Sequence, residues 1–196
     1  MDEKKSYQIL QFAEDRDGYV SVSEAKRFGI AQTYLVLAEE EGQFEKVAKG
    51  LYVKKGYPID PYYILHYRYP KAVFHLLSAA TLHGWIEQDA DLLSVKCPRN
   101  YMTAGIQGAR VTHAGFEDYQ RGIGLTVTKN GLFVPVTDKE RTLVDIVRHM
   151  AGFSNETFKV IIRNAFASNL DEQQLVAYAK ELRQEKEIEL LRKIYQ

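Results

Sequence analysis

Apolar positions in the first forty residues recur at helical spacing, with turn signals between the repeats. Residues 3–16 carry one apolar stripe among charged positions, which predicts an amphipathic helix. Ser21 followed three residues later by Glu24 forms a capping box, which predicts a second, short helix that ends at Gly29. A third helix is expected over about residues 31–41.

The pattern then changes from helix to strand. Residues 44–53 are rich in strand-type side chains, and Lys49-Gly50 among them is a turn signal, so they predict a β-hairpin. Helix, short helix, tight turn, helix and hairpin is the order of a winged helix-turn-helix. We therefore predict such a domain over residues 1–56.

The rest of the chain mixes helical and strand patterns. Two prolines within residues 57–61 predict a linker, and a second domain over residues 62–196 is expected after it. We expect helices over about 62–69, 71–84, 138–150 and 155–167, and from 171 to the end with a break near Gln184. A Thr137/Glu140 capping box opens the third of these helices, and Ser154 or Asn155 caps the fourth. Strands are expected over 92–95, 110–113, 125–128 and 132–136, with Asn130-Gly131 as a hairpin turn. The predicted class is α+β: an N-terminal winged helix-turn-helix, then a larger C-terminal domain in which helices flank a small, mostly antiparallel sheet.

Candidate DNA contacts lie on the third helix and on the elements beside it. Gln32, Thr33 and Val36 are its expected exposed early positions, where Gln can pair with adenine and the methyl groups of Thr and Val can meet thymine. Polar and basic side chains of the second helix and the hairpin are candidates for the phosphate backbone. They are Ser21, Ser23, Lys26, Arg27, Lys46, Lys49, Lys54 and Lys55.

The charge balance leaves a second reading of this domain open. The chain has 26 Lys and Arg against 26 Asp and Glu, which argues against a protein that coats nucleic acid along its length. Winged helices also serve as protein-interaction modules. The alternative is therefore a module that does not bind DNA and that neutralises or scaffolds a partner protein.

Several basic residues of the C-terminal domain fall at the ends of predicted elements. A basic face built from them could hold DNA backbone or RNA, or it could be a solvated surface laced with salt bridges. The candidates are Arg99, Arg110, Lys129, Lys139, Arg141, Arg148, Lys159 and Arg163. Arg141 and Asp145 are spaced by four residues and could simply neutralise each other.

No arrangement of residues predicts catalysis, a cofactor or a metal. The single cysteine, Cys97, excludes a disulfide framework or a cysteine-rich zinc module, and no convincing base accompanies it. His75 and His83 are eight residues apart on one predicted helix, which is not the spacing of a metal pair. Asp89 and Asp91 resemble the paired carboxylates of nucleotidyltransferases, but the Gly-Ser turn of that class is missing. We expect a protein that is not an enzyme.

Nothing in the sequence predicts a membrane protein. The longest apolar stretches are far shorter than the roughly 20 residues of a membrane helix. The N-terminus lacks the apolar core of a secretory signal. We expect a cytoplasmic protein without a membrane partner.

Four stretches together resemble one family. Residues 28–30 with 41–52 resemble the N-terminal domain of the AbiEi family, the antitoxins of AbiE abortive-infection, type IV toxin–antitoxin systems. Residues 75–84 resemble the family's central helix, and residues 94–99 its strand and Pro-Arg turn. Residues 135–148 resemble its C-terminal signature and are the most specific of these stretches.

The resemblance implies a two-domain transcriptional repressor and antitoxin. Family members bind inverted repeats in the promoter of their own operon, repress it, and counteract a nucleotidyltransferase toxin without depending on a stable complex with it. The implied partners are thus double-stranded DNA and, functionally, such a toxin. Relatives often carry a basic residue early in the third helix where this chain has Gln32, which leaves the operator sequence open.

Overall fold

The computed structural model describes residues 3–87 and 92–195, and the chain divides into two compact units. The first unit comprises Met1–Arg68 with Thr128–Leu132, and the second comprises Tyr69–Val127 with Phe133–Gln196. The expected linker, residues 57–61, lies inside the first unit. It does so because the helix after it packs against the hairpin, where the Tyr67 hydroxyl donates to the Gly50 carbonyl at 3.0 Å.

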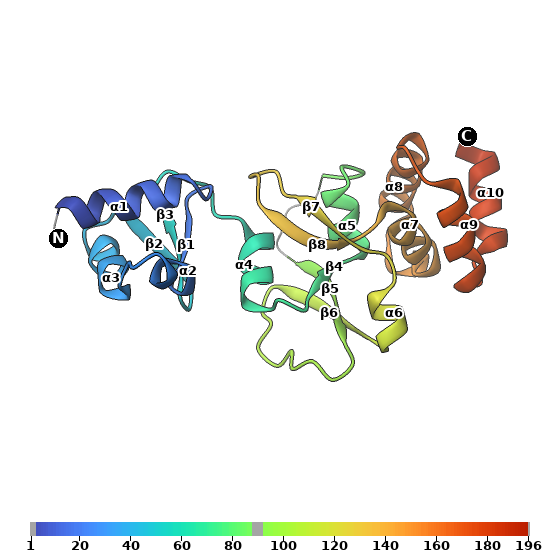
Figure 1. Cartoon of the computed structure of the whole chain (residues 1–196). Coiled ribbons are helices and arrows are strands. Elements are labelled where there is room, and N and C mark those ends of the chain that lie inside the picture. The colour runs from blue at the N-terminus through green and yellow to red at the C-terminus, as the bar shows by residue number, and fades with distance from the viewer. Residues whose placement is uncertain (1–2, 88–91, 196) are drawn as a thin grey trace. The chain divides into compact units, whose positions relative to one another are not determined.

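In the first unit, helices gather around a three-stranded sheet (Figure 1). Its elements are α1 (Glu3–Glu14), β1 (Tyr19–Ser21), α2 (Val22–Arg27), α3 (Gln32–Glu40), β2 (Phe44–Ala48), β3 (Leu51–Lys54) and α4 (Pro61–Arg68). The strands are antiparallel in the order β1-β3-β2. The expected helices and hairpin are confirmed, and the arrangement is consistent with a winged helix. Strand β1 was not predicted.

The buried side chains of α1, β1, α2, the turn after it and α3 form one core with the hairpin. They are Ile9, Phe12, Ala13, Val20, Ala25, Ile30, Leu35, Ala38, Phe44 and Tyr52. The apolar stripe predicted for α1 supplies three of them, so the amphipathic pattern of that helix is explained by burial against α3 and the sheet.

The second unit contains a five-stranded sheet with helices packed beside it (Figure 1). Its elements are β4 (Val73–Phe74), α5 (Leu76–Leu82), β5 (Leu93–Pro98), β6 (Ala109–Ala114), α6 (Phe116–Gln120), β7 (Ile123–Val127), β8 (Phe133–Thr137), α7 (Lys139–Arg148), the 3-10 helix η1 (Met150–Gly152), α8 (Asn155–Ala167), α9 (Glu172–Glu181) and α10 (Glu185–Tyr195). The side chains of α5 and α7 to α10 share one core around Trp85 and Leu143.

The prediction of a mostly antiparallel sheet is wrong. The strand order is β6-β5-β4-β8-β7, in which β4–β5 and β7–β8 are antiparallel but β5–β6 and β4–β8 are parallel. The expected hairpin, β7 with β8, does form, and Gly131 in its turn has a φ of +86°. The β4–β8 pair joins strands that are distant along the chain, and for the consecutive strands β5 and β6 the local pattern does not encode the direction of pairing.

The predicted helix over residues 71–84 is also wrong in its first part. Val73 and Phe74 form β4, both buried, and only residues 76–82 are helical. The backbone prevents a continuous helix, because His75 is extended and Leu76 has a φ of +48°. Two buried apolar residues suit a central strand as well as a helix face, so their spacing alone misleads.

The predicted cap of α7 is displaced by one residue. Asp138, not Thr137, is the N-cap, and its carboxylate accepts from the Arg141 amide at 2.7 Å. Thr137 ends β8 with its hydroxyl 2.8 Å from that of Thr142. Glu140 does not bond back to the cap but accepts from the Asp171 amide at 2.6 Å.

The starts of the later helices agree with the predictions, and the predicted Ser154 cap is confirmed. Ser154 caps α8 and Asp171 caps α9, each accepting from the amide three residues on. The expected break near Gln184 falls between α9 and α10, where Arg183 has a φ of +58°. Within residues 3–87 and 92–195, no helix is long and apolar enough to cross a membrane.

Candidate nucleic-acid interface

The turn between α2 and α3 holds these two helices together. The Ser21 hydroxyl accepts from the Glu24 amide at 3.2 Å and thereby caps α2. Gly29 after α2 has a φ of +76°, which a residue without Cβ adopts without strain. Ile30 then returns to the core, where it is 1% exposed, and its amide donates to the Ala25 carbonyl at 2.9 Å. The result is a fixed helix-turn-helix.

The first two turns of α3 present the side chains that the sequence singled out. Gln32, Thr33 and Val36 are all exposed. Leu37 is exposed as well and lies one turn after Thr33 on the same face. It was not among the predicted residues, although its i, i+4 spacing from Thr33 could have suggested it. The opposite face is buried through Leu35 and Ala38.

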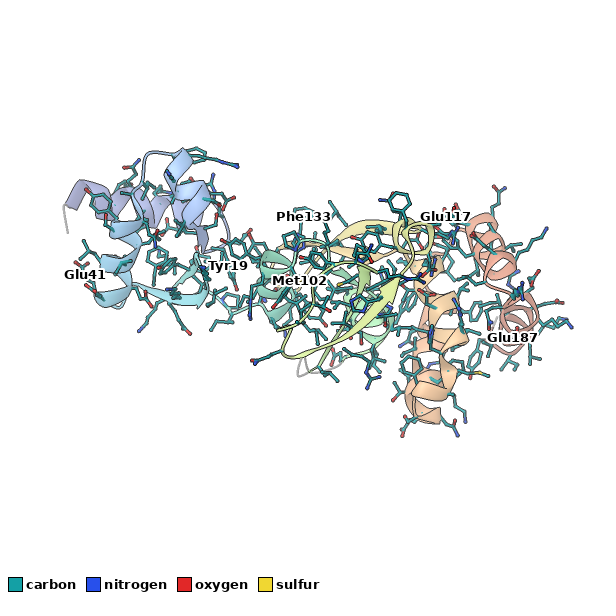
Figure 2. The ribbon with its side chains drawn as sticks, turned by 90° about the horizontal axis from the view of Figure 1, so that it is seen from below. Tyr19, Glu41, Met102, Glu117, Phe133 and Glu187 are labelled. Carbon is teal, nitrogen blue, oxygen red and sulfur yellow. The ribbon has the colours of Figure 1, made fainter. Side chains whose placement is uncertain are left out.

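The N-terminus of α3 suits an anion. Its N-cap residue, Ala31, makes no side-chain hydrogen bond to the helix, and the first turn contains no acidic residue. The backbone N–H groups of that turn carry the positive end of the helix dipole. Acidic side chains are confined to the other end of α3, where Glu41 follows it (Figure 2). A phosphate beside the first turn would therefore be attracted rather than repelled.

The candidates for the phosphate backbone fall into three groups. Ser23, Lys26, Arg27, Lys46, Lys49 and Lys55 are exposed. Lys54 is half-buried and forms an ion pair with Glu14. Ser21 is buried and committed to capping α2, so its side chain does not face solvent.

One cation near the turn was missed by the sequence analysis. The Arg16 guanidinium lies 3.8 Å from the centroid of the Phe12 ring and 5.1 Å from that of Phe28. Phe28 is 58% exposed and directly precedes Gly29. Phe12 lies four residues before Arg16, a spacing that could have suggested the first contact, but the contact with Phe28 exists only once α1 and α2 are folded together.

The comparison with protein families bears directly on this unit. Residues 7–53 match the family of AbiEi antitoxin transcriptional regulators. The match runs from α1 through β3 and so covers the helix-turn-helix and the hairpin. It confirms the resemblance over these residues. The later stretches that resembled the AbiEi family lie outside the match, and no curated protein matches the chain. The matched family is one of regulators and not a class of enzymes.

The basic residues proposed as one face of the C-terminal domain do not all belong together. Arg141 is 1% exposed and forms ion pairs with Asp118 and Asp145, so it cannot be part of an exposed face. Lys129 lies in the segment that belongs to the first unit. Lys139 is half-buried, and the other candidates are exposed: Arg99, Arg110, Arg148, Lys159 and Arg163. Lys159 and Arg163 share a face of α8, as their spacing predicted.

A buried network of charges occupies the place where Arg141 was expected to be exposed. The Asp145 carboxylate accepts from Lys96 Nζ at 3.1 Å and from Arg141 Nε at 2.9 Å, and all three side chains are almost fully buried. Arg141 Nη2 also donates to Asp118 at 2.6 Å. Burial acts to raise the pKa of Asp118, but the hydrogen bond from Arg141 and the nearby positive charges outweigh it and lower that pKa. Of these contacts, only the Arg141–Asp145 pair was expected from the sequence.

His75 lies beside this network as a neutral side chain. It is 2% exposed, and its Nε2 has no hydrogen-bond partner among the described residues. Burial, together with the positive charge of Lys96, lowers the pKa of His75 to about 3. His83 instead lies after α5, with Nε2 2.8 Å from the Thr137 carbonyl oxygen. The two histidines thus have separate structural surroundings.

No cluster suited to a metal is found among the described residues. Cys97 is buried in β5, and burial raises the pKa of its thiol to about 11. A thiol with that pKa is protonated at neutral pH and is a poor nucleophile. Asp89 and Asp91, which resembled paired carboxylates, lie outside the described residues.

Proposed function

We propose that this protein is a cytoplasmic, DNA-binding antitoxin of a type IV, abortive-infection system, and that it represses its own operon at inverted repeats in the promoter. The observation that carries the proposal is the exposed face of α3 with its uncapped N-terminus, inside the residues that match the AbiEi regulators. An exposed helix on a buried helix-turn-helix support is the usual way in which such domains read the major groove.

In this proposal α3 reads bases and its neighbours hold phosphates. The Gln32 carboxamide can donate to N7 and accept from the amino group of one adenine, and the Thr33 and Val36 methyl groups can contact thymine methyl groups. The exposed basic residues of α2 and the hairpin position the helix on the backbone. Ser21 and Lys54 are left out of this interface, because one is buried and the other is paired with Glu14.

A mobility-shift titration on the DNA just upstream of the gene tests the base-reading part. We expect the wild type to prefer this fragment over unrelated DNA, and a Gln32→Ala/Thr33→Ala variant to lose the preference. Gln11→Ala, an exposed glutamine on α1, is the matched control and should bind as the wild type does. Equal affinity of the wild type for both fragments would reject the proposal.

Salt dependence tests the phosphate part separately. Each lysine that contacts a phosphate contributes a slope of about −0.9 to a plot of log K against log salt. We expect Lys49→Ala/Lys55→Ala to weaken binding to every DNA and to reduce the slope by about 2. An unchanged slope would remove the hairpin from the interface.

As an antitoxin, the protein is proposed to counteract a nucleotidyltransferase toxin without a stable complex. Support comes from the antitoxin description of the matched family and, for the toxin class, from the wider resemblance alone. Coexpression with a nucleotidyltransferase encoded next to this gene should restore growth, while copurification of the two proteins should fail. Persistent toxicity would refute the antitoxin role, and a stable complex would refute type IV behaviour.

One observation favours the alternative, a protein-binding module. Val36 and Leu37 make the exposed face of α3 partly apolar, and Phe28 is exposed in the preceding turn. Such side chains are typical of protein interfaces as well as of thymine contacts. Binding to DNA that is weak, unspecific and unaffected by Gln32→Ala/Thr33→Ala would favour this alternative.

A further inference from the structure

Strand β7 is an unusual edge of the sheet in the second unit. Among the described residues it pairs with β8 alone. Ile123, Leu125 and Val127 are apolar and exposed, at 38, 72 and 46%, and Phe133, opposite Val127 on β8, is 64% exposed. These four residues form an apolar strip, here called the β7 strip, and Figure 2 labels Phe133 at its end.

The backbone of β7 also offers hydrogen bonds on its outer side. At one end of the β7–β8 ladder the Asp138 amide donates to the Gly122 carbonyl at 2.7 Å, and at the other the Thr128 amide donates to the Leu132 carbonyl at 2.8 Å. In an antiparallel pair, bonded and non-bonded residue pairs alternate, so the even-numbered residues of β7 bond to β8. The odd-numbered residues, the apolar ones, therefore direct their N–H and C=O groups away from the sheet.

The opposite edge of the same sheet is protected. Figure 1 places β6 on the far side of the sheet from β7, and β6 carries the exposed Arg110. Charged side chains on an edge strand prevent pairing with another chain. Strand β7 contains neither a charged residue nor a proline. Of the two edges, only β7 has the composition of a strand that pairs.

We propose that β7 is the pairing edge for a second copy of this chain, with the two β7 strands antiparallel and Leu125 opposite Leu125 of the other copy. This register is self-complementary, because Ile123 then lies opposite Val127 of the copy. The outward N–H and C=O groups of these residues bond to their counterparts, and the two β7 strips join on one face of a continuous sheet. The uncharged strand offers no charge for an acidic or basic partner to recognise.

The area of the β7 strip indicates how strongly two copies pair. From the exposed fractions, the strip offers about 300 Å² of apolar surface per copy, or about 600 Å² for two. Stable interfaces bury about 1,200–2,000 Å². The pairing is therefore weak in dilute solution. It becomes effective where another contact already holds two copies together at millimolar effective concentration.

The pairing of two copies on one operator rests on the proposed function, because only a repressor bound at an inverted repeat brings two copies together there. An inverted repeat seats two proteins about a two-fold axis, and antiparallel pairing of identical strands has the same symmetry. Two copies on one operator would thus be coupled through β7.

Disulfide trapping without DNA tests the pairing and its register. With Leu125 on the two-fold axis, the Cα atoms of the two Leu125→Cys residues lie about 5.5 Å apart, within the range for a disulfide. In Ile123→Cys or Val127→Cys alone they lie about 13 Å apart. Under mild oxidation of concentrated protein we expect Leu125→Cys to form dimers, and a mixture of Ile123→Cys with Val127→Cys to form them too. The wild type, whose Cys97 is buried, is the blank.

Two outcomes would overturn the proposal. Leu125→Cys that stays monomeric would exclude the pairing, and equal trapping of all three single variants would exclude the register. The result does not depend on DNA, so the proposed repressor role can fail while this inference stands, and the reverse is also possible.

Binding to the upstream fragment then tests where the pairing acts. We expect the wild type to bind the two half-sites cooperatively. The second copy should bind roughly tenfold more tightly than one copy binds an isolated half-site. Leu125→Lys should lose this cooperativity and keep its affinity for one half-site. Val176→Lys, a matched exposed apolar position on α9, should keep both. Equal cooperativity in Leu125→Lys and the wild type would contradict pairing on DNA.

Discussion

The buried network around Asp145 should dominate the stability of the second unit. Its carboxylate oxygen Oδ2 accepts from both Lys96 and Arg141, and none of the three side chains is more than 4% exposed. In Asp145→Asn two buried cations would share only the partly exposed Asp118. Removing one partner of a buried ion pair typically costs about 3–5 kcal/mol, because the other charge remains buried. We expect a loss of stability of this size.

Tryptophan fluorescence measures this loss for the second unit alone. The chain has one tryptophan, Trp85, and it is buried in the core of that unit. We expect urea unfolding followed by this signal to give the loss above, with a melting temperature lower by about 10–20 °C. Lys96→Met/Asp145→Asn should be less unstable than Asp145→Asn, since one orphaned charge is removed with its partner.

Asp118→Asn is the matched control. Its side chain is 39% exposed and contacts the same cations, so solvent can replace part of what the substitution removes. We expect a loss of less than half of that for Asp145→Asn. A larger loss for Asp118→Asn, or a loss under about 1 kcal/mol for Asp145→Asn, would refute the reasoning from burial.

Three further predictions concern single positions. His75 has a pKa of about 3 in the folded state against 6.5 in the unfolded state, so below pH 6.5 protons bind the unfolded state preferentially. The free energy of unfolding should therefore fall as pH falls, by about 2 kcal/mol at pH 5. His75→Asn should remove this part of the pH dependence of urea unfolding, and an unchanged dependence would contradict the prediction. Gly18→Ala would place Cβ 2.2 Å from Tyr57 Cγ, whereas a Cβ at Gly29 would meet open space. Unfolding followed by circular dichroism should therefore show a larger loss of stability for Gly18→Ala than the about 1–2 kcal/mol expected for Gly29→Ala. Equal losses would show that Tyr57 moves aside. The buried Asp60 carboxylate accepts four hydrogen bonds, so Asp60→Ala should cost about 3 kcal/mol or more, and Asp60→Asn less; a near-neutral Asp60→Ala would be inconsistent with that role.

Local chemistry made much of the first unit predictable. The Ser21 cap and the Gly29 turn each depend on neighbours within three residues, and the structure contains both. The exposed face of α3 followed from helical spacing in the same way. These are the features that place the candidate interface.

What the sequence did not reveal depends on contacts between distant residues. Strand β1 has three residues and β4 only two, too few for a periodic signal, and each exists because a partner strand is in place. Arg141 looked like a surface cation because its partner Asp118 is 23 residues away, and Lys96, which shares Asp145 with it, is 45 residues away. The parallel direction of the pairing between the consecutive strands β5 and β6 is likewise not encoded in the pattern of either strand.

Footprinting on the upstream DNA tests the central claim most directly. If the protein reads an inverted repeat through α3, two protected segments should appear, related by two-fold symmetry and centred about 10 base pairs, or a multiple of that, apart. The Gln32→Ala/Thr33→Ala variant should protect neither at the same concentration. Uniform protection along the fragment would contradict the claim that this protein is a sequence-reading repressor. So would the absence of protection at a concentration that saturates unrelated DNA.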